Sequence, residues 1–358
     1  MRLAPRHRDV TLDMGGPHAK VSGWIDVSLI DCRGRVVHRH QQHNLVLNKG
    51  LDYILANFAA DDTTKYVAVG TGTAVPATTD TALVAETART NATLGLGSDL
   101  AVTRLADGQW RISRTRAFDY AQANGNLTEF GGSQSSSSVD GVNTRELFRD
   151  GANNPIVVTK TSNERLAITY NIDITLSPTV QAAAANVLLK DSGGATVATL
   201  LTKHVFTTPD GSTNNRASGD ITLYSQLLYS FGSWGTNAGA YGGVGPRWLS
   251  RYTTTMNMTY LGGAHDLGSA LNTGGGYGGF LAYTNGNFYR NIEGEQAAEA
   301  SDQSVYGYGI FTTGYDGNYY YNGTGYKIRF VDAGGADAPY LKNKDYRLKL
   351  AAKLSLSR

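Results

Sequence analysis

The sequence predicts a mainly β protein with a β-sandwich-like N-terminal domain containing short helices, a Gly/Tyr-rich β domain, and a C-terminal strand that returns to the first domain. Three observations lead to this fold class. Apolar and polar residues alternate at period two in several segments, as they do in half-buried strands. Only 17% of the 358 residues are charged. The chain also contains 43 glycines and 21 tyrosines, a composition typical of short strands joined by tight turns.

The chain is long enough for two domains of about 150 residues each. We expect an extended arm over residues 1–19, a β domain over 20–180, a Gly/Tyr-rich β domain over 181–340, and a strand over 341–358 that completes the first domain. The arm contains prolines and a Gly-Gly pair but shows no apolar period. We therefore expect it to be a frayed tail or a segment that orders against a neighbouring subunit.

The first domain is expected to begin with a hairpin. Its strands cover residues 21–30 and 36–42, its turn lies at 31–34, and Trp24 serves as its apolar anchor. A short helix should follow, because Asn48 can accept a backbone N–H of a first turn. Apolar residues then recur at helical spacing, at Leu51, Ile54, Leu55 and Phe58.

After this helix, residues 66–69 read as a buried strand that Gly70-Thr71-Gly72 ends. Asp80 is placed to cap a second short helix over residues 81–86. Further strands are predicted by alternation or β-branched content at 110–118, 127–130, 156–160, 166–176, 187–190 and 196–201. The last two flank a predicted hairpin turn at 191–194.

The strand over residues 166–176 has the clearest pattern, since every second residue is apolar up to Pro178. The C-terminal residues 346–358 alternate in the same way, with one apolar and one basic face. Because the two segments match in length and pattern, we expect them to pair in one sheet.

The composition excludes several classes of protein. A net charge of +2 is too small to predict nucleic-acid binding. One cysteine, Cys32, excludes an intramolecular disulfide. No apolar run is long enough for a secretory signal or for a membrane span of about 18 residues. We therefore expect a protein that is made in a cytoplasm and does not insert into membranes.

Few residues have the spacing that chemistry requires. His38 and His40 share a strand face and could bind one metal ion, although a polar hairpin face or a subunit contact is the simpler explanation for such a pair. No nucleophile, metalloprotease or phosphate-loop motif is present, and Gly70-Thr71-Gly72 lacks the third glycine of a dinucleotide site. The prediction is a protein without catalytic residues, cofactor or metal. Glu293, Glu295 and Glu299 would be the candidates for glycoside cleavage, but a solvated acidic loop is the simpler explanation.

The second domain is dense in aromatic residues. Tyr and Trp beside Gly, Ser and Asn favour adaptable recognition surfaces, and they also pack inside irregular β domains. Both alternatives remain open for the candidate ligand or interaction residues, which are Trp234, Tyr241, Trp248, Tyr252, Tyr277, Tyr283, Tyr289, Tyr319, Tyr320 and Tyr321. The stretch from 230 to 326 shows no strict repeat, so neither a solenoid nor collagen is predicted.

One stretch carries a family resemblance. Residues 44–90 combine a helix, a strand ending in VGTGT, a Pro/Thr loop and the run TAL–E–R. This order resembles a segment common in virion structural proteins of tailed bacteriophages, such as tail-fibre, baseplate and collar components. The resemblance extends to residues 23–27 and 31–34 and to RELFRDGANNPIVVTKTSNERLAITYNIDI over 145–174.

The resemblance implies a non-enzymatic component of a phage particle, most simply in the tail, which acts by self-assembly and by docking of the first domain. Its expected partners are other virion proteins and further copies of itself, and it would be assembled in the host cytoplasm. A receptor-binding fibre or adhesin for a cell-surface glycan is one alternative, and a capsid decoration protein is a second. A tail-associated polysaccharide or cell-wall hydrolase is a third.

Overall fold

The computed structural model describes residues 8–13, 18–57, 60–106, 109–177, 185–207, 245–252, 269–270, 279–280, 282–296, 302–315, 320–343 and 346–358. It confirms the mainly β prediction, with most strands in one large mixed sheet and with two small sheets, β8–β11 and β19–β22. The first half contains β1 (Arg8–Asp13), β2 (His18–Asp31), β3 (Val36–Val46), α1 (Asn48–Asn57), the 3₁₀ helix η1 (Asp61–Thr64), β4 (Tyr66–Gly70), β5 (Glu86–Thr90), β6 (Ala101–Ala106), β7 (Gln109–Phe118), β8 (Gly125–Leu127), β9 (Glu129–Ser133), the 3₁₀ helix η2 (Ser138–Asp140), β10 (Thr144–Leu147), β11 (Val158–Lys160) and β12 (Glu164–Ser177). The second half contains β13 (Ala185–Asp191), β14 (Thr196–Thr207), β15 (Gly245–Tyr252), β16 (Ser269–Ala270), β17 (Gly279–Phe280), β18 (Tyr289–Gln296), β19 (Gln303–Val305), β20 (Gly307–Tyr315), β21 (Tyr320–Phe330), β22 (Tyr340–Lys342) and β23 (Tyr346–Ser357).

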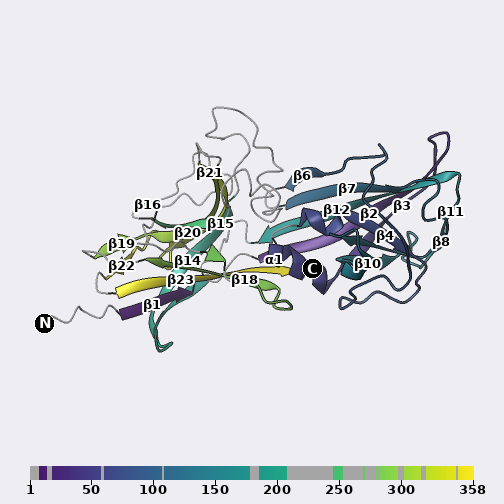
Figure 1. Cartoon of the computed structure of the whole chain (residues 1–358). Coiled ribbons are helices and arrows are strands. Elements are labelled where there is room, and N and C mark those ends of the chain that lie inside the picture. Colours follow the sequence, from purple (N-terminus) through teal and green to yellow (C-terminus); the bar gives the residue numbers. More distant parts are fainter. Residues whose placement is uncertain are drawn as a thin grey trace.

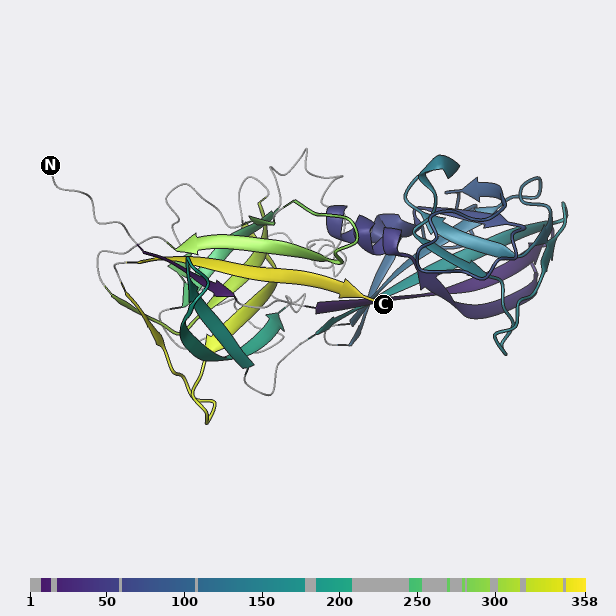
Figure 2. The same cartoon turned by 90° about the horizontal axis from the view of Figure 1, so that it is seen from below.

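The strands form two lobes that meet near α1 and the C-terminus (Figures 1 and 2). In the first lobe, the order β6–β7–β12–β2–β3 forms one layer, and β5–β4–β9–β10 forms the other. The end of β3 also pairs with β10 and so joins the two layers. Ile25, Ile168 and Phe130 belong to the apolar core of this lobe, which is sandwich-like as predicted.

Three long strands serve both lobes. On β2, Ile25 and Val27 pack in the core of the first lobe, whereas Ala19 and Val21 pack in the core of the second. The strands β7 and β12 are divided in the same way between the two cores. Because side chains at period two share one face, β2 and β12 each present the same face to both cores, and that face of β7 carries the buried Arg114 and Arg116 between its two apolar ends. The lobes are therefore joined by hydrogen-bonded strands.

The second half of the chain repeats the strand order of the first. Each strand from β2 to β12 has a counterpart, in the same sequence order, from β13 to β23, and we name these two sets the first and second repeats. The ladders keep the same register. The strand pair β9–β10 matches Phe130 with Glu146, and β20–β21 matches Tyr308 with Ile328. The pair β4–β9 then places Val69 beside Phe130, just as β15–β20 places Arg251 beside Tyr308.

Irregular features recur as well. The hairpin β2–β3 has a register shift between Leu29 and Ile30, and β13–β14 has one between Leu189 and Lys190. Buried aromatic pairs also correspond: the rings of Phe130 and Phe148 lie 5.0 Å apart, and those of Tyr308 and Phe330 lie 6.0 Å apart. Lys160 and Lys342 end equivalent strands, are both buried, and each donates to the next backbone carbonyl, over 3.3 and 3.4 Å.

One type of turn closes hairpins in both repeats. An aspartate accepts backbone N–H groups of later turn residues, and the residue at the fourth position has a positive φ, which favours glycine or asparagine. The turns begin at Asp31, Asp150, Asp191 and Asp332, and the fourth residues are Gly34 (φ 79), Asn153 (φ 67), Gly194 (φ 84) and Gly335 (φ 84). The expected turns at 31–34 and 191–194 are thus confirmed.

The two repeats differ at one strand. In the first repeat, β2 pairs directly with β12 from His18↔Ser177 to Asp31↔Glu164. In the second repeat, β1 lies between the equivalent strands, antiparallel to β13 and parallel to β23. The expected arm is therefore partly ordered: residues 8–13 are a strand of this same chain. The C-terminal strand β23 lies in the same large sheet as β12, as expected, but the two strands do not pair with each other, because β2 and β7 flank β12 on both sides. The end of β23 does reach the start of β2, from His18↔Ser355 to Lys20↔Ser357.

Three local predictions were also wrong. Asn48 is the first residue of α1, and its side chain accepts a hydrogen bond from Arg358 instead of capping the helix. Residues 81–85 form no helix, because the N–H groups of Val84 and Ala85 donate to the Glu129 carboxylate. Trp24 is only half-buried, under the Arg111 guanidinium, since the opposite face of β2 points to the core.

Candidate functional site

The candidate site is a surface made by two loops of the first repeat, at residues 71–85 and 134–143. The first loop connects β4 to β5, and the second connects β9 to β10. Two charged residues on the strands hold these loops, Glu129 on β9 and Arg89 on β5. Neither side chain has a role that the strand ladders require, so each needs its own explanation.

Glu129 is fully buried and fixes the 71–85 loop. Its Oε1 accepts the backbone N–H of Gly72 over 3.1 Å and that of Ala85 over 2.8 Å. Its Oε2 accepts the N–H of Val84 and the Nε–H of Arg145, over 3.1 and 3.0 Å. A buried carboxylate is stable only when it is paired and hydrogen-bonded, and here both oxygens are satisfied. One side chain therefore joins the beginning and the end of this loop.

The glycines of VGTGT make this close approach possible. A Cβ on Gly72 would lie 2.3 Å from Glu129 Oε1, and a Cβ on Gly70 would lie 2.4 Å from the Ala85 carbonyl oxygen. Both distances are far shorter than a real Cβ contact allows. The glycines thus serve the packing of a loop on a carboxylate rather than phosphate binding.

Arg145 extends this charged cluster to the loop tip. Its Nη1 pairs with Asp80 over 2.5 Å, and its Nη2 donates to the Ala74 carbonyl over 2.8 Å. Burial by itself would raise the pKa of Asp80, but the Ala77 N–H and the Arg145 guanidinium outweigh it and lower the pKa. Asp80, expected as a helix cap, therefore stays ionised and anchors the loop to β10.

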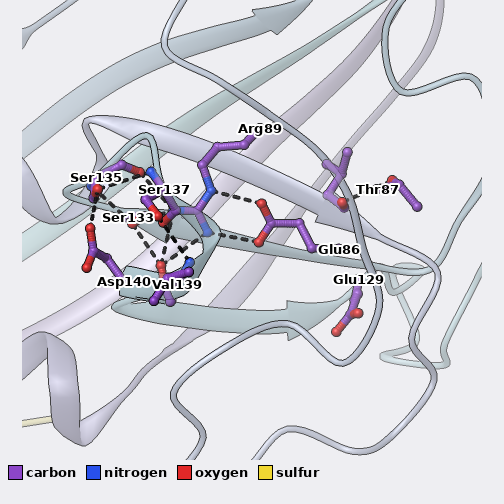
Figure 3. A network of polar contacts seen from close by, with 12 residues as sticks. Glu86, Thr87, Arg89, Glu129, Ser133, Ser135, Ser137, Val139 and Asp140 are labelled. Carbon is purple, nitrogen blue, oxygen red and sulfur yellow. Dashed lines mark hydrogen bonds and ion pairs between the residues drawn. The ribbon is translucent and has the colours of Figure 1, made fainter.

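Arg89 holds the 134–143 loop (Figure 3). Its guanidinium makes a two-point ion pair with Glu86, over 2.9 and 2.8 Å. Nη1 also donates to Ser133 Oγ and to the carbonyl oxygens of Ser135 and Ser137, over 2.8, 2.8 and 3.1 Å. The planar fork of arginine suits such convergent acceptors. The serine-rich run over residues 133–138 is thus wrapped around one cation.

The second repeat lacks these residues although it has the same strand registers. Gly307 stands at the position of Glu129, because it opposes Arg329 as Glu129 opposes Leu147. By the same comparison Lys327 stands at the position of Arg145, and Ala270 at that of Arg89. The connection between β20 and β21 spans only residues 316–319. The fold therefore forms without the charged cluster, which serves the loops of the first repeat.

These loops present apolar side chains to solvent. Val139 is 94% exposed, Val75 is 78% exposed and Val84 is 59% exposed. The loops contact each other, since Val142 donates its N–H to the Thr81 carbonyl over 2.9 Å. Single exposed apolar residues are common on protein surfaces, so it is the position of these valines on two loops held by buried charges that makes the loops a candidate site.

His38 and His40 do come together on β3. Their ring nitrogens Nε2 and Nδ1 lie 2.9 Å apart, and His40 Nε2 continues to Gln42 Oε1 over 3.2 Å. Burial lowers the pKa of His40, with a smaller contribution from His38. Within the described part of the chain no group of three or more His, Cys, Asp or Glu residues is placed to hold a metal ion. The pair forms a polar ladder at the sandwich edge.

Four of the ten aromatic candidates lie outside the described residues: Trp234, Tyr241, Tyr277 and Tyr319. For Trp248, Tyr252, Tyr320 and Tyr321 only the backbone is described, in β15 and β21. Tyr283 is engaged inside the chain, because its hydroxyl donates to Asp52 of α1 over 2.5 Å. The ring of Tyr289 lies 4.9 Å from Lys353 Nζ. The candidates with described side chains thus contact neighbouring elements of their own chain.

Sequence reasoning missed Glu129, Arg145 and Arg89. Little in the sequence marks these three residues as buried, since a charged residue in a strand pattern normally points to solvent. Glu129 interrupts the strand predicted over 127–130, and that interruption was the only available hint.

Comparisons with protein families, curated proteins and solved structures found no match to this chain. Among the described residues, no helix has both the length and the apolar character needed to cross a membrane.

Proposed function

We propose that this chain is a non-enzymatic structural component of a tailed bacteriophage particle. It acts by self-assembly and by docking to other virion proteins, most simply in the tail as a fibre, baseplate or collar piece. The observation that carries the proposal is the loop pair of the first repeat, which buried charges fix and which exposes three valines. The family resemblance also centres on this region, since the VGTGT run supplies Gly70 and Gly72 of the loop.

The chemistry of the site favours docking over catalysis. The hydrogen bonds of Glu129 and Arg145 go to backbone atoms, to each other and, from Arg145, to the Asp80 carboxylate. A carboxylate bound in this way is a structural anchor rather than a proton donor or acceptor. Rigid loops lose little entropy on binding, so the exposed valines can contribute their apolar area to a partner surface.

The test is incorporation into particles of the phage whose genome encodes the chain. Val84→Asp and Val139→Asp place charges on the loop surface, and Val197→Asp, on an exposed site of β14, is the matched control. Wild-type and Val197→Asp chains should be present in purified particles by quantitative mass spectrometry, and the loop variants should be at least tenfold depleted. Equal unfolding temperatures would show that all chains fold.

Two results would contradict the proposal. Absence of the wild-type chain from purified particles would exclude a virion role. Undiminished incorporation of both loop variants would exclude the 71–85 and 134–143 loops as the docking surface.

A further inference from the structure

The strand β1 occupies a slot that the repeat does not need. In the first repeat the equivalent slot is closed, because β2 and β12 pair directly along their whole length. In the second repeat, β13 and β23 are held apart by β1, which is the only described strand without a counterpart in the other repeat. The ladders of β23 with β1 and with the start of β2 are parallel, whereas the other described ladders are antiparallel. Relative to the first repeat, β1 is thus an additional strand in the second lobe.

The side chains of β1 make specific contacts with the strands on both sides of the slot. Val10 and Leu12 are 3% and 1% exposed and belong to the apolar core of the second lobe. On the other face, Asp9 makes a two-point ion pair with Arg347, over 3.0 and 2.8 Å, and lies 3.3 Å from Lys349. Backbone pairing supplies affinity in such a slot, and alternate side chains supply specificity.

The strands that flank the slot are suited to close on each other. In the first repeat Leu29 opposes Leu166. The equivalent residues of the second repeat are Leu189 and Leu348, which are both buried in the same core. Direct pairing of β13 with β23 would therefore match apolar faces, as β2 and β12 do. Pairing of β13 with β23 in the absence of β1 would leave no unpaired sheet edge between them, which would lower the cost of removing β1.

We propose that β1 is an exchangeable strand, and that β1 of one copy inserts between β13 and β23 of the next copy and so links copies of this chain. The contacts in the exchanged form are those seen within one chain, so the exchange needs no new interface. The inference rests on the proposed self-assembly and names its route. Because the donor segment and the slot are different surfaces, the contact is heterologous and can produce rings or filaments.

A cysteine pair tests this route directly in the full chain. Thr11 of β1 lies opposite Lys190 of β13 in an antiparallel ladder, a Cα separation that a disulfide can bridge. In a Cys32→Ser background, one tagged chain carries Thr11→Cys and a differently tagged chain carries Lys190→Cys. The two are co-expressed, purified together and oxidised. The proposal predicts a disulfide-linked heterodimer, because each chain by itself has only one thiol.

The matched control replaces Lys190→Cys with Val197→Cys, an exposed position on β14 that does not pair with β1. It should give at least tenfold less heterodimer. Charge reversal gives a second measurement: Asp9→Arg in one chain should reduce the cross-link, and Arg347→Asp in the other chain should restore it.

The outcomes separate the route from the proposed function. Cross-linking no greater than in the Val197→Cys control would overturn strand exchange, whether the chains are monomeric or oligomeric by light scattering. Oligomers without the cross-link would leave self-assembly in place by another surface. The particle experiment remains independent, since it measures incorporation and not the position of β1.

Discussion

The two repeats share their strand order and registers but differ in their buried polar residues. Phe130 and Phe148 correspond to Tyr308 and Phe330, and each pair is buried in its own lobe. Glu129, by contrast, corresponds to Gly307. Features present in both repeats belong to the fold, and a buried charge present in only one of them must serve something local. This comparison separates scaffold from site without any second protein.

The largest expected effects are in the shared cores. Phe148→Ala and Phe330→Ala should each lower the free energy of unfolding by about 3–5 kcal/mol, because each leaves a large cavity in a buried cluster. Urea unfolding would measure both, with hydrogen exchange to assign each loss to its repeat. A difference above about 2 kcal/mol between the two variants would mean that these positions are not equivalent.

The second prediction concerns the unshared charge. Glu129→Gln should cost about 3 kcal/mol, because its amide NH₂ would face N–H donors and leave Arg145 without its buried partner. Exchange of the Gly72, Val84 and Ala85 amides should accelerate more than that of the β9 ladder. Glu146→Gln, on a partly exposed ion pair with Arg149, is the control and should cost less than about 1 kcal/mol. Equal acceleration along β9 would assign Glu129 to the fold.

The third prediction is a difference in acid sensitivity. His204 is buried where the first repeat has Asn44, since Val205 pairs with Lys327 as Leu45 pairs with Arg145. Burial lowers the pKa of His204 to about 4, below the value of about 6.5 in the unfolded chain. The folded state therefore holds a neutral imidazole, and this stabilisation is present above pH 6.5 and is lost as the pH falls towards 4.

His204→Asn should remove this dependence. Between pH 7 and pH 4 the wild-type chain should lose about 2–3 kcal/mol more stability than the variant. Urea unfolding at several pH values measures the difference. Parallel pH profiles for the two chains would show that His204 is protonated without cost, and would contradict the burial argument.

The smallest effects are expected at the shared turns. Gly34→Ala and Gly194→Ala should each cost about 1 kcal/mol, because both residues have positive φ while open space surrounds the missing Cβ. Asn153→Gly, in the equivalent turn after β10, should be neutral or slightly stabilising. Chemical unfolding would measure all three. A cost for Asn153→Gly similar to that of the alanine variants would show that the asparagine side chain contributes more than its conformation.

Much of the local structure could be predicted from the sequence. The alternation in residues 166–176 gave β12, the turn residues gave the hairpins at Asp31 and Asp191, and the C-terminal alternation gave β23. The predicted faces were right where the whole strand alternates. The predicted burial of Trp24 was wrong, because the smaller apolar residues on the opposite face of β2 form the core and Trp24 lies on the partly exposed face.

The candidate site could not be predicted, because each of its interactions joins distant parts of the chain. Glu129 reaches Gly72 and Ala85 from another strand. Those contacts also explain why the expected helix over 81–86 does not form: a carboxylate from β9 takes the N–H groups that would begin it. The local preference of residues 81–86 for a helix is weak compared with hydrogen bonds to a buried carboxylate from another strand.

The sequence by itself determined which segments are strands and where they turn, since period two and positive-φ residues act over a few neighbouring positions. Only the tertiary structure decided which strands pair, that the halves of the chain repeat one topology, and that β1 separates β13 from β23. The physical reason is that an alternating strand fits beside many others equally well. The choice among them is made when the apolar faces close around a common core.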